Sequence, residues 1–123
     1  MTLNPKLTID ESDMAASIRD RYSVSAALTA RAGGGQALGT PITAAISRFT
    51  VAATIGDSAT LPVALPGANC TIVNYGATAM NVFPAVGGTI NALTANTAFA
   101  IPAGKGCMFM CPVAGNWATV LGA

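Results

Sequence analysis

Charged residues are scarce in this 123-residue chain. Lysine and arginine together number 6 and aspartate and glutamate 5, so charged residues make up 9% of the sequence and the formal net charge is +1. An average soluble domain is about 25% charged. A surface with so few charges is covered by small polar and apolar side chains or is buried against partners, and contiguous exposed apolar surface usually marks a contact site. The composition therefore favours an oligomer or an assembly component.

Histidine is absent, which removes the commonest general base and metal ligand. After residue 48 the chain contains one carboxylate, Asp57, in a Gly-Asp-Ser sequence typical of a turn, and one amine, Lys105, in a glycine-flanked turn. A pair of carboxylates for glycoside hydrolysis would have to come from the acidic residues at positions 10–20. We therefore expect no enzymatic activity and no cofactor or metal site, and a small hydrolase is the least favoured function.

Long hydrophobic runs and basic stretches are missing as well. The apolar runs are interrupted by Gly, Pro, Asn or Thr and stay short of the roughly 20 residues that span a bilayer. The N-terminal sequence MTLNPKLTIDESDM carries acids where an export signal has a basic end and an apolar core. A basic stripe interleaved with aromatic residues, typical of nucleic-acid binding, is also lacking. We expect neither a membrane nor a nucleic-acid partner.

The three cysteines, Cys70, Cys107 and Cys111, form an odd set without CxxC spacing. A zinc site would need further cysteine or histidine ligands that the chain lacks. In a protein made in the cytoplasm, this set indicates three buried free thiols. A disulfide between Cys70 and either Cys107 or Cys111 is the alternative.

Charge is distributed unevenly, because nine of the eleven charged residues lie within the first 48 positions. The sequence RAGGGQALGTP, residues 31–41, is rich in glycine and ends in a proline, which is typical of a flexible junction. We therefore predict an N-terminal arm with a Gly-rich linker over residues 1–40 and a neutral domain over residues 41–123.

Within the arm, Met14, Ile18 and Tyr22 are spaced by four residues, which would place them on one face of a short helix. Thr8 and Glu11 have the spacing of a capping box. An extended arm that becomes ordered only against a neighbouring subunit is the alternative. A helix of this length is marginal in water, so both interpretations require a partner surface.

The remainder of the chain has a β pattern. From about Ile46, short runs rich in Val, Ile, Thr and Phe alternate with turn signals about every eight to twelve residues. Prolines recur through this part and would break helices. The pattern predicts a mainly β fold, an antiparallel β-sandwich of about eight strands resembling a jelly roll.

One strand of this domain has two apolar faces. In the sequence GCMFMCP, alternation places Cys107, Phe109 and Cys111 on one side and Met108 and Met110 on the other. One face belongs to the core, and the other needs a second cover. That cover is a subunit contact or, alternatively, a loop or the N-terminal arm. In the strand NCTIVNY the same alternation gives one mainly apolar side and one mixed side. Trp117 is predicted to lie in the core.

The stretch from Arg48 to Leu121 resembles a β-rich domain of virion proteins from tailed bacteriophages. The resemblance rests on a Gly-Asp-Ser turn followed by Leu-Pro, a Val-Phe-Pro-Ala step and Ile-Asn-x-Leu-x-x-Asn, and then on an Ala-Gly-Lys turn, a Phe-x-Cys strand and a closing Gly-x-Trp. In this chain these are Gly56–Ser58 with Leu61 and Pro62, Val82–Ala85, Ile90–Asn96, Ala103–Lys105, Phe109–Cys111 and Gly115–Trp117. These motifs are turns and strands rather than reactive residues.

The resemblance implies a capsid decoration, or cement, protein. Such proteins sit as trimers on the outside of a phage head, so the expected partners are the major capsid protein and two further copies. The expected location is the virion head surface, after synthesis in the cytoplasm of the bacterial host. The residues expected to form subunit or capsid contacts are Met14, Ile18, Tyr22, Phe99, Met108 and Met110. The alternative is a trimeric tail-fibre or receptor-binding module that presents loops near Asn91, Asn96 and Asn116, with Trp117, to a host surface glycan.

Overall fold

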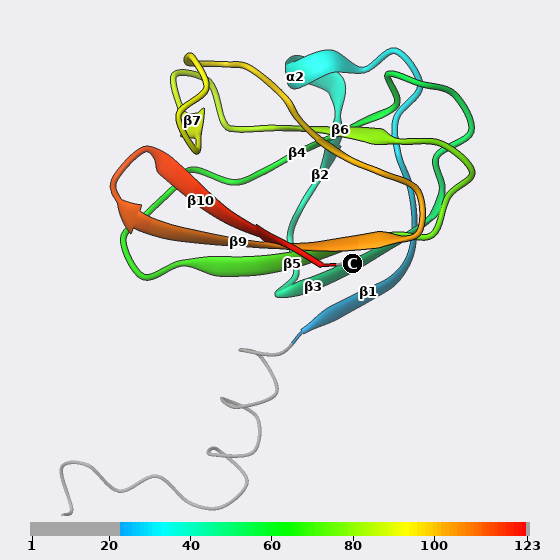
Figure 1. The fold of residues 1–123 in the computed structure, drawn as a ribbon, viewed down its shortest axis with the longest axis horizontal. Coiled ribbons are helices and arrows are strands. Elements are labelled where there is room, and N and C mark those ends of the chain that lie inside the picture. The colour runs from blue at the N-terminus through cyan, green and yellow to red at the C-terminus, as the bar shows by residue number, and fades with distance from the viewer. Residues whose placement is uncertain (1–22, 123) are drawn as a thin grey trace, which may run out of the picture.

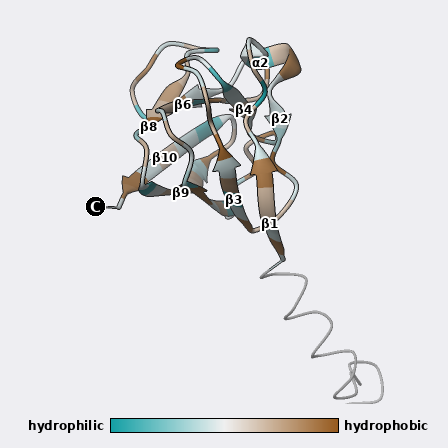
Figure 2. Ribbon diagram, turned by 90° about the vertical axis from the view of Figure 1, so that its right-hand side faces the viewer, coloured by the Kyte–Doolittle hydropathy of each residue, from teal (hydrophilic) through white to brown (hydrophobic). Residues whose placement is uncertain are grey.

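The computed structural model describes residues 23–122, which form two β-sheets packed face to face (Figures 1 and 2). The larger sheet contains six strands in the order β1-β3-β5-β9-β10-β7, and the smaller contains four in the order β2-β4-β6-β8. The mainly β prediction is confirmed. The elements are β1 (Val24–Thr29), α2 (Gly35–Leu38), β2 (Thr40–Pro41), β3 (Ile46–Val51), β4 (Ser58–Thr60), β5 (Asn69–Asn74), β6 (Met80–Phe83), β7 (Thr89–Ile90), β8 (Phe99–Ile101), β9 (Lys105–Val113) and β10 (Asn116–Leu121).

The first six strands wind as a β-solenoid. Successive strands alternate between the two sheets, so that β1, β3 and β5 stack in parallel in the larger sheet while β2, β4 and β6 stack in parallel in the smaller one. Two parallel strands normally need a long crossover connection, usually a helix. Here each crossover contains a strand of the opposite sheet, so the winding forms both layers at once.

The last four strands close this winding in a different way. β9 pairs antiparallel with β5, β10 with β9, and β8 with β6. Only the short strand β7 pairs in parallel, on the far side of β10. The C-terminal strands therefore pair mainly antiparallel with their neighbours, unlike the coils that precede them.

The expectation of an antiparallel jelly-roll sandwich is wrong, because most strand pairs within residues 23–122 are parallel. Short strands separated by turn signals occur in both architectures, so this pattern does not distinguish them. A repeat does distinguish them. Pro41, Pro62 and Pro84 recur at intervals of about 21 residues, close to the repeat length of solenoids. Each proline ends a strand of the smaller sheet or follows it within two residues.

The domain also begins earlier than the expected boundary between residues 40 and 41, which falls inside β2. β1 pairs with β3, and Ala30 directly after it is buried in the core. The Gly-rich stretch is a structured connection between the two sheets. Gly33 and Gly35 adopt φ angles of 62° and 58°, which glycine reaches without the steric cost of a Cβ atom, and α2 follows against β4 and β6.

Adjacent coils are in close contact where they turn from one sheet to the other. The backbone N–H of Thr78 donates to the carbonyl oxygen of Ala52 over 2.9 Å. A Cβ atom on Gly76 would lie 2.6 Å from the Cβ of Ala52 and closer still to its backbone nitrogen, so this position admits only glycine without a shift of the backbone. The buried side chain of Asn74 provides hydrogen bonds at the same turn. Its amide donates to the carbonyl oxygens of Thr78 and Ile101, each over 2.9 Å.

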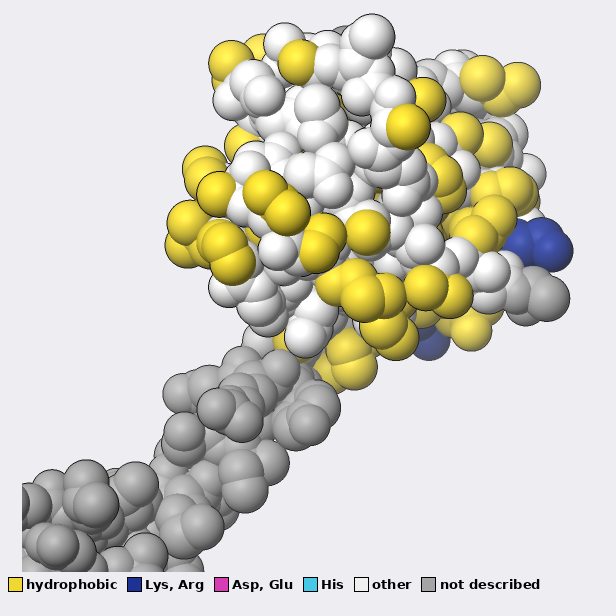
Figure 3. Space-filling view, turned by 60° about the vertical axis from the view of Figure 1, so that its left-hand side comes forward, with side chains coloured by type: hydrophobic (Ala, Val, Ile, Leu, Met, Phe, Trp, Pro, Cys, Tyr) yellow, Lys and Arg dark blue, Asp and Glu magenta, His cyan; other side chains and the backbone are white. Residues whose placement is uncertain are grey.

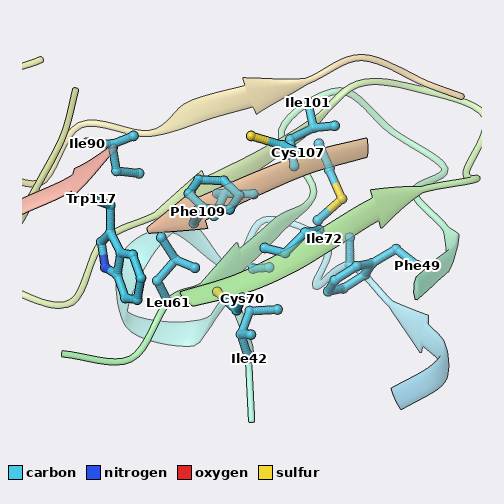
Figure 4. Packing of buried hydrophobic residues seen from close by; sticks show 14 of the residues in the cluster. Ile42, Phe49, Leu61, Cys70, Ile72, Ile90, Ile101, Cys107, Phe109 and Trp117 are labelled. Atoms are coloured by element: carbon cyan, nitrogen blue, oxygen red, sulfur yellow. The ribbon is translucent and has the colours of Figure 1, made fainter. Parts of the chain in front are cut away.

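The core lies between the two sheets and is made of apolar side chains with exposed fractions near zero (Figure 4). Phe49, Ile72, Phe109 and Trp117 come from the larger sheet, and Ile101 comes from the smaller one. Burying a large apolar side chain is worth about 1.5–3 kcal/mol. These contacts hold the larger sheet by its inner face and leave its other face turned outward.

Candidate interaction surface

The outward side of the six-stranded sheet carries a row of apolar side chains. Strand register places Val24 beside Ile46, Ile46 beside Thr71, Thr71 beside Met108, and Met108 beside Val120. Met108 and Val120 are 47% and 57% exposed. A row that crosses five strands gives a continuous apolar surface rather than isolated exposed residues.

Two further rows flank this one. Met110, 36% exposed, is aligned with Asn69, and Val73 lies between Arg48 and Gly106. We call the whole surface the outer face and define it by its outward-pointing residues: Val24, Ile46, Arg48, Asn69, Thr71, Val73, Gly106, Met108, Met110 and Val120. Arg48 is its single charged residue. Exposed apolar surface of this continuity is a feature of contact sites.

A groove of about 410 Å³ runs over the outer face. Its sides are formed by Val73, Tyr75, Met108 and Val120. Gly106 and Gly122 also line it, and the N–H of Gly122 donates to the carbonyl oxygen of Gly106 over 2.6 Å. Because two neighbouring positions lack a side chain, the sheet is hollowed here.

Four charged residues lie within residues 23–122, and their placement is uneven. Asp57 is buried, and its carboxylate accepts the N–H groups of Ala53 and Thr54 over 3.0 and 3.2 Å, which confirms its predicted turn role. The other three are cations: Arg31 and Arg48 are exposed, and Lys105 is half-buried. In Figure 3 the charged side chains visible on the described domain are dark blue, and yellow hydrophobic side chains gather on its lower side.

Among the expected contact residues, Met108 and Met110 lie together on the outer face, opposite the buried Cys107, Phe109 and Cys111. The predicted division of this strand into two sides is confirmed.

Phe99 is a correction to the set. It lies on β8 of the other sheet, partly buried, with its ring edge-on to Phe109 at a centroid distance of 6.0 Å. Phe99 therefore packs against the core of its own domain and does not lie on the outer face with the two methionines. Met14, Ile18 and Tyr22 lie outside the described residues.

The three thiols are free and buried, as predicted, and no disulfide joins them. Burial raises the pKa of Cys70 to about 11, with a smaller contribution from nearby Cys107, whose own pKa burial also raises to about 11. Such thiols stay protonated at neutral pH and are poor nucleophiles. Within the described part of the chain, no group of three or more His, Cys, Asp or Glu side chains is arranged to hold a metal ion.

Trp117 is 1% exposed and lies beside Ile90 and Leu61, which confirms its predicted place in the core (Figure 4). Its ring is therefore not a surface for stacking a sugar. Tyr75, exposed at the groove, is the aromatic residue that the sequence argument did not single out. The alternation in NCTIVNY groups Tyr75 with Thr71 and Val73, but its position beside Val120 depends on the order of the strands.

The asparagines of the β7–β10 region have their side chains engaged within the domain. Asn91 donates to the hydroxyl of Thr119 over 2.8 Å and accepts the N–H of Thr119 over 3.0 Å. Asn96 accepts the N–H of Gly87 over 2.7 Å. Asn116 donates to the hydroxyl of Thr89 over 2.7 Å. The bonds of Asn91 and Asn116 hold the chain at β7 against β10.

No family model, curated protein or solved structure matches this chain. Across residues 23–122, none of the helical structure is long and apolar enough to span a membrane.

Proposed function

We propose that the protein is a structural component of a virion that binds the outside of a phage capsid and cements the head lattice as a homotrimer. The observation that carries the proposal is the outer face, an apolar and almost uncharged sheet surface that the second sheet does not cover. Met108 and Met110 on this face are the contact residues named from sequence alone. The resemblance to capsid decoration proteins supplies the partners, which are the major capsid protein and two further copies.

Cementing requires surface rather than reactive groups. Burial of apolar surface contributes roughly 25 cal/mol per Å², and a stable protein interface buries about 1,600 Å² in total. Methionine side chains suit such a surface because they are flexible and polarisable and adapt to the shape of a partner. A protein that binds only the assembled lattice stabilises that lattice by mass action. The outer face offers what this mechanism needs.

The free thiols are consistent with a virion protein that is made in the host cytoplasm. Free buried cysteines are typical of proteins made in a reducing cytoplasm. The bacterial host cytoplasm is such a compartment, and the head surface is reached from it during particle assembly. The proposal therefore needs no export step.

The alternative, glycan recognition by a tail-fibre module, finds less support in the geometry. The side chain of Trp117 is buried, and those of Asn91, Asn96 and Asn116 form hydrogen bonds within the domain. A glycan site generally combines an exposed aromatic platform with free polar groups. Trp117 provides no such platform, and the three asparagine side chains are at least partly engaged within the domain.

The test is the number of copies of this chain per virion, measured by quantitative mass spectrometry against the major capsid protein. We expect hundreds of copies, near parity with the capsid subunit. A few copies per particle would move the chain to the tail and favour receptor binding. Absence from purified particles would overturn the virion function itself.

A further inference from the structure

The groove on the outer face depends on a glycine that the domain itself does not require. Gly106 is not among the glycines with positive φ. A Cβ atom added there would lie 3.6 Å from the Cγ2 of Val73 and 3.8 Å from the carbonyl oxygen of Ile72, which are ordinary contacts. Glycine in a strand costs roughly 0.5–1 kcal/mol relative to alanine and often marks a close approach by another chain. Gly76 differs from Gly106, because a Cβ atom at Gly76 would overlap the backbone of Ala52 and the fold itself requires glycine there.

One charge lies on the outer face beside the groove. Arg48 is in the same row as Val73 and Gly106, and its Nε donates to the carbonyl oxygen of Ala26 on β1 over 2.6 Å. The one carboxylate of residues 23–122 is buried at Asp57, so the domain supplies no exposed acid to pair with this cation. The groove therefore suits an apolar element that carries carboxylates.

The chain contains one such element, residues 10–22. Its apolar side chains recur every fourth residue and are flanked by acids, as the sequence DESDMAASIRDRY shows. The apolar members are Met14, Ile18 and Tyr22. The acids are Asp10, Glu11, Asp13 and Asp20, and they outnumber the two arginines of the segment, Arg19 and Arg21. We propose that residues 10–22 of a neighbouring copy occupy the groove, with the apolar side chains on Met108 and Val120 and the acids beside Arg48. This inference rests on the homotrimer of the proposed function and names its contact.

Reach decides between the neighbouring copy and the same copy. Ser23 is held beside β3, because its carbonyl oxygen accepts the N–H of Ile46 over 2.9 Å and its hydroxyl accepts the N–H of Ala45 over 3.1 Å. β1 and β9 are separated by two strands, a distance of about 14 Å at normal strand spacing. Tyr22 is one residue from Ser23, so its backbone advances by about 3.6 Å at most. Even with its side chain extended, Tyr22 falls short of β9 in its own copy. Met14 and Ile18 are far enough along the chain to reach their own groove, so only a neighbouring copy places all three apolar side chains on Met108 and Val120 together.

Cysteine cross-linking between two distinguishable copies tests this contact. One chain carries Ile18→Cys and a differently tagged, co-expressed chain carries Met108→Cys. The native thiols are buried, and Cys70 and Cys107 have raised pKa values, so the new pair reacts first under mild oxidation. We expect a disulfide-linked dimer that carries both tags. The matched control replaces Met108→Cys by Leu38→Cys, which is exposed on α2 against the other sheet.

The inference is overturned if the two-tag dimer is absent or forms no faster than with Leu38→Cys. It is also overturned if a single chain carrying both Ile18→Cys and Met108→Cys closes an internal disulfide and migrates as a compact monomer. That outcome would identify the same copy as the source.

Filling the groove provides a second measurement. Gly106→Leu should raise the dissociation constant of the oligomer about tenfold or more, the effect of disturbing a central contact, with the urea midpoint used to verify folding. Gly106→Ala, which fits the available space, is the folding control. An oligomer unchanged by Gly106→Leu overturns the inference and leaves the cement function standing. Absence of the chain from virions overturns the cement function and leaves a positive cross-link valid.

Discussion

The two faces of the six-stranded sheet are both apolar but differ in what covers them. The inner face, which includes Phe49, Ile72 and Phe109, has exposed fractions near zero because the four-stranded sheet packs on it. The outer face, with Met108 and Val120, is composed of similarly apolar residues and stays exposed. Hydrophobicity alone therefore does not identify the core of this protein. It identifies two apolar faces of one sheet, and within the domain only the inner face is covered, by the four-stranded sheet.

The two faces also differ in the kind of apolar residue they use. Aromatic rings and branched side chains fill the inner face, where fixed rotamers and dense packing favour one structure. The outer face shares branched side chains with the inner face, in its valines and Ile46, but it has two methionines and an open glycine position in place of the aromatic rings. Adaptable side chains around a hollow suit a surface that meets a separate partner. Substitutions on one face should therefore affect folding, and substitutions on the other should affect association.

The largest effect is expected from truncation on the inner face. Phe109→Ala should lower the free energy of unfolding by about 3–5 kcal/mol, because it leaves a cavity between the sheets. Urea denaturation followed by circular dichroism measures this loss. Met110→Ala, on the adjacent outward position, is the control and should cost far less. Equal losses for the two variants would contradict the distinction between the faces.

Two glycine substitutions sharpen the comparison. Gly76→Ala should lower the free energy of unfolding by about 1–3 kcal/mol, since its Cβ would overlap the backbone of Ala52 in the adjacent coil. Gly106→Ala on the outer face should be neutral or stabilise by up to about 1 kcal/mol, since the space is open and alanine is better tolerated in a strand. Both values come from denaturant titration. A destabilising Gly106→Ala would show that this position serves folding rather than contact.

The inner-face thiols should give the domain a stability that declines at alkaline pH. In the unfolded chain these thiols ionise near 9.0, while burial keeps Cys70 and Cys107 protonated up to about pH 11. The unfolded state therefore loses protons first, and the contribution is present below pH 9 and lost as the pH rises toward 11. Chemical denaturation from pH 8 to 11 measures the slope. Cys107→Ala should make it shallower, and an unchanged slope would assign the decline to other groups.

The smallest effect on stability is expected from a charge on the outer face. Met108→Lys should change the free energy of unfolding by no more than about 0.5 kcal/mol, the usual range for exposed positions. It should nevertheless dissociate the oligomer, because an ammonium group would be buried in an apolar contact without a partner. Sedimentation velocity measures the association state. A variant that remains fully associated would place the contact elsewhere.

The sequence predicts well those features that depend on neighbouring residues. Alternation assigns both sides of β9 correctly, and the Gly-Asp-Ser sequence identifies the turn at Asp57. The parallel winding is not predictable in this way, because it depends on which distant strands pair. The interval between Pro41, Pro62 and Pro84 is the signal for it.

The groove is a further feature that local patterns do not reveal. Its lining joins Tyr75 after β5 to Gly106 on β9 and Val120 on β10, which become neighbours only through the strand order. Similarly, the small side chains of VSAALT do not distinguish β1 from a linker until β3 lies beside it. The sequence therefore places expected contact residues on a common face only where one strand carries them, as with Met108 and Met110.

Methionine oxidation in the assembled protein tests the central claim, that the outer face is covered in the assembly, most directly. Met80 is fully buried and serves as the internal standard, while Met108 and Met110 are exposed in the single chain. Limited peroxide treatment followed by peptide mass spectrometry gives the rate at each residue. The account predicts that Met108 and Met110 oxidise as slowly as Met80 in the assembly and become reactive when Val120→Asp dissociates it. Rapid oxidation of both methionines in the intact assembly would contradict it.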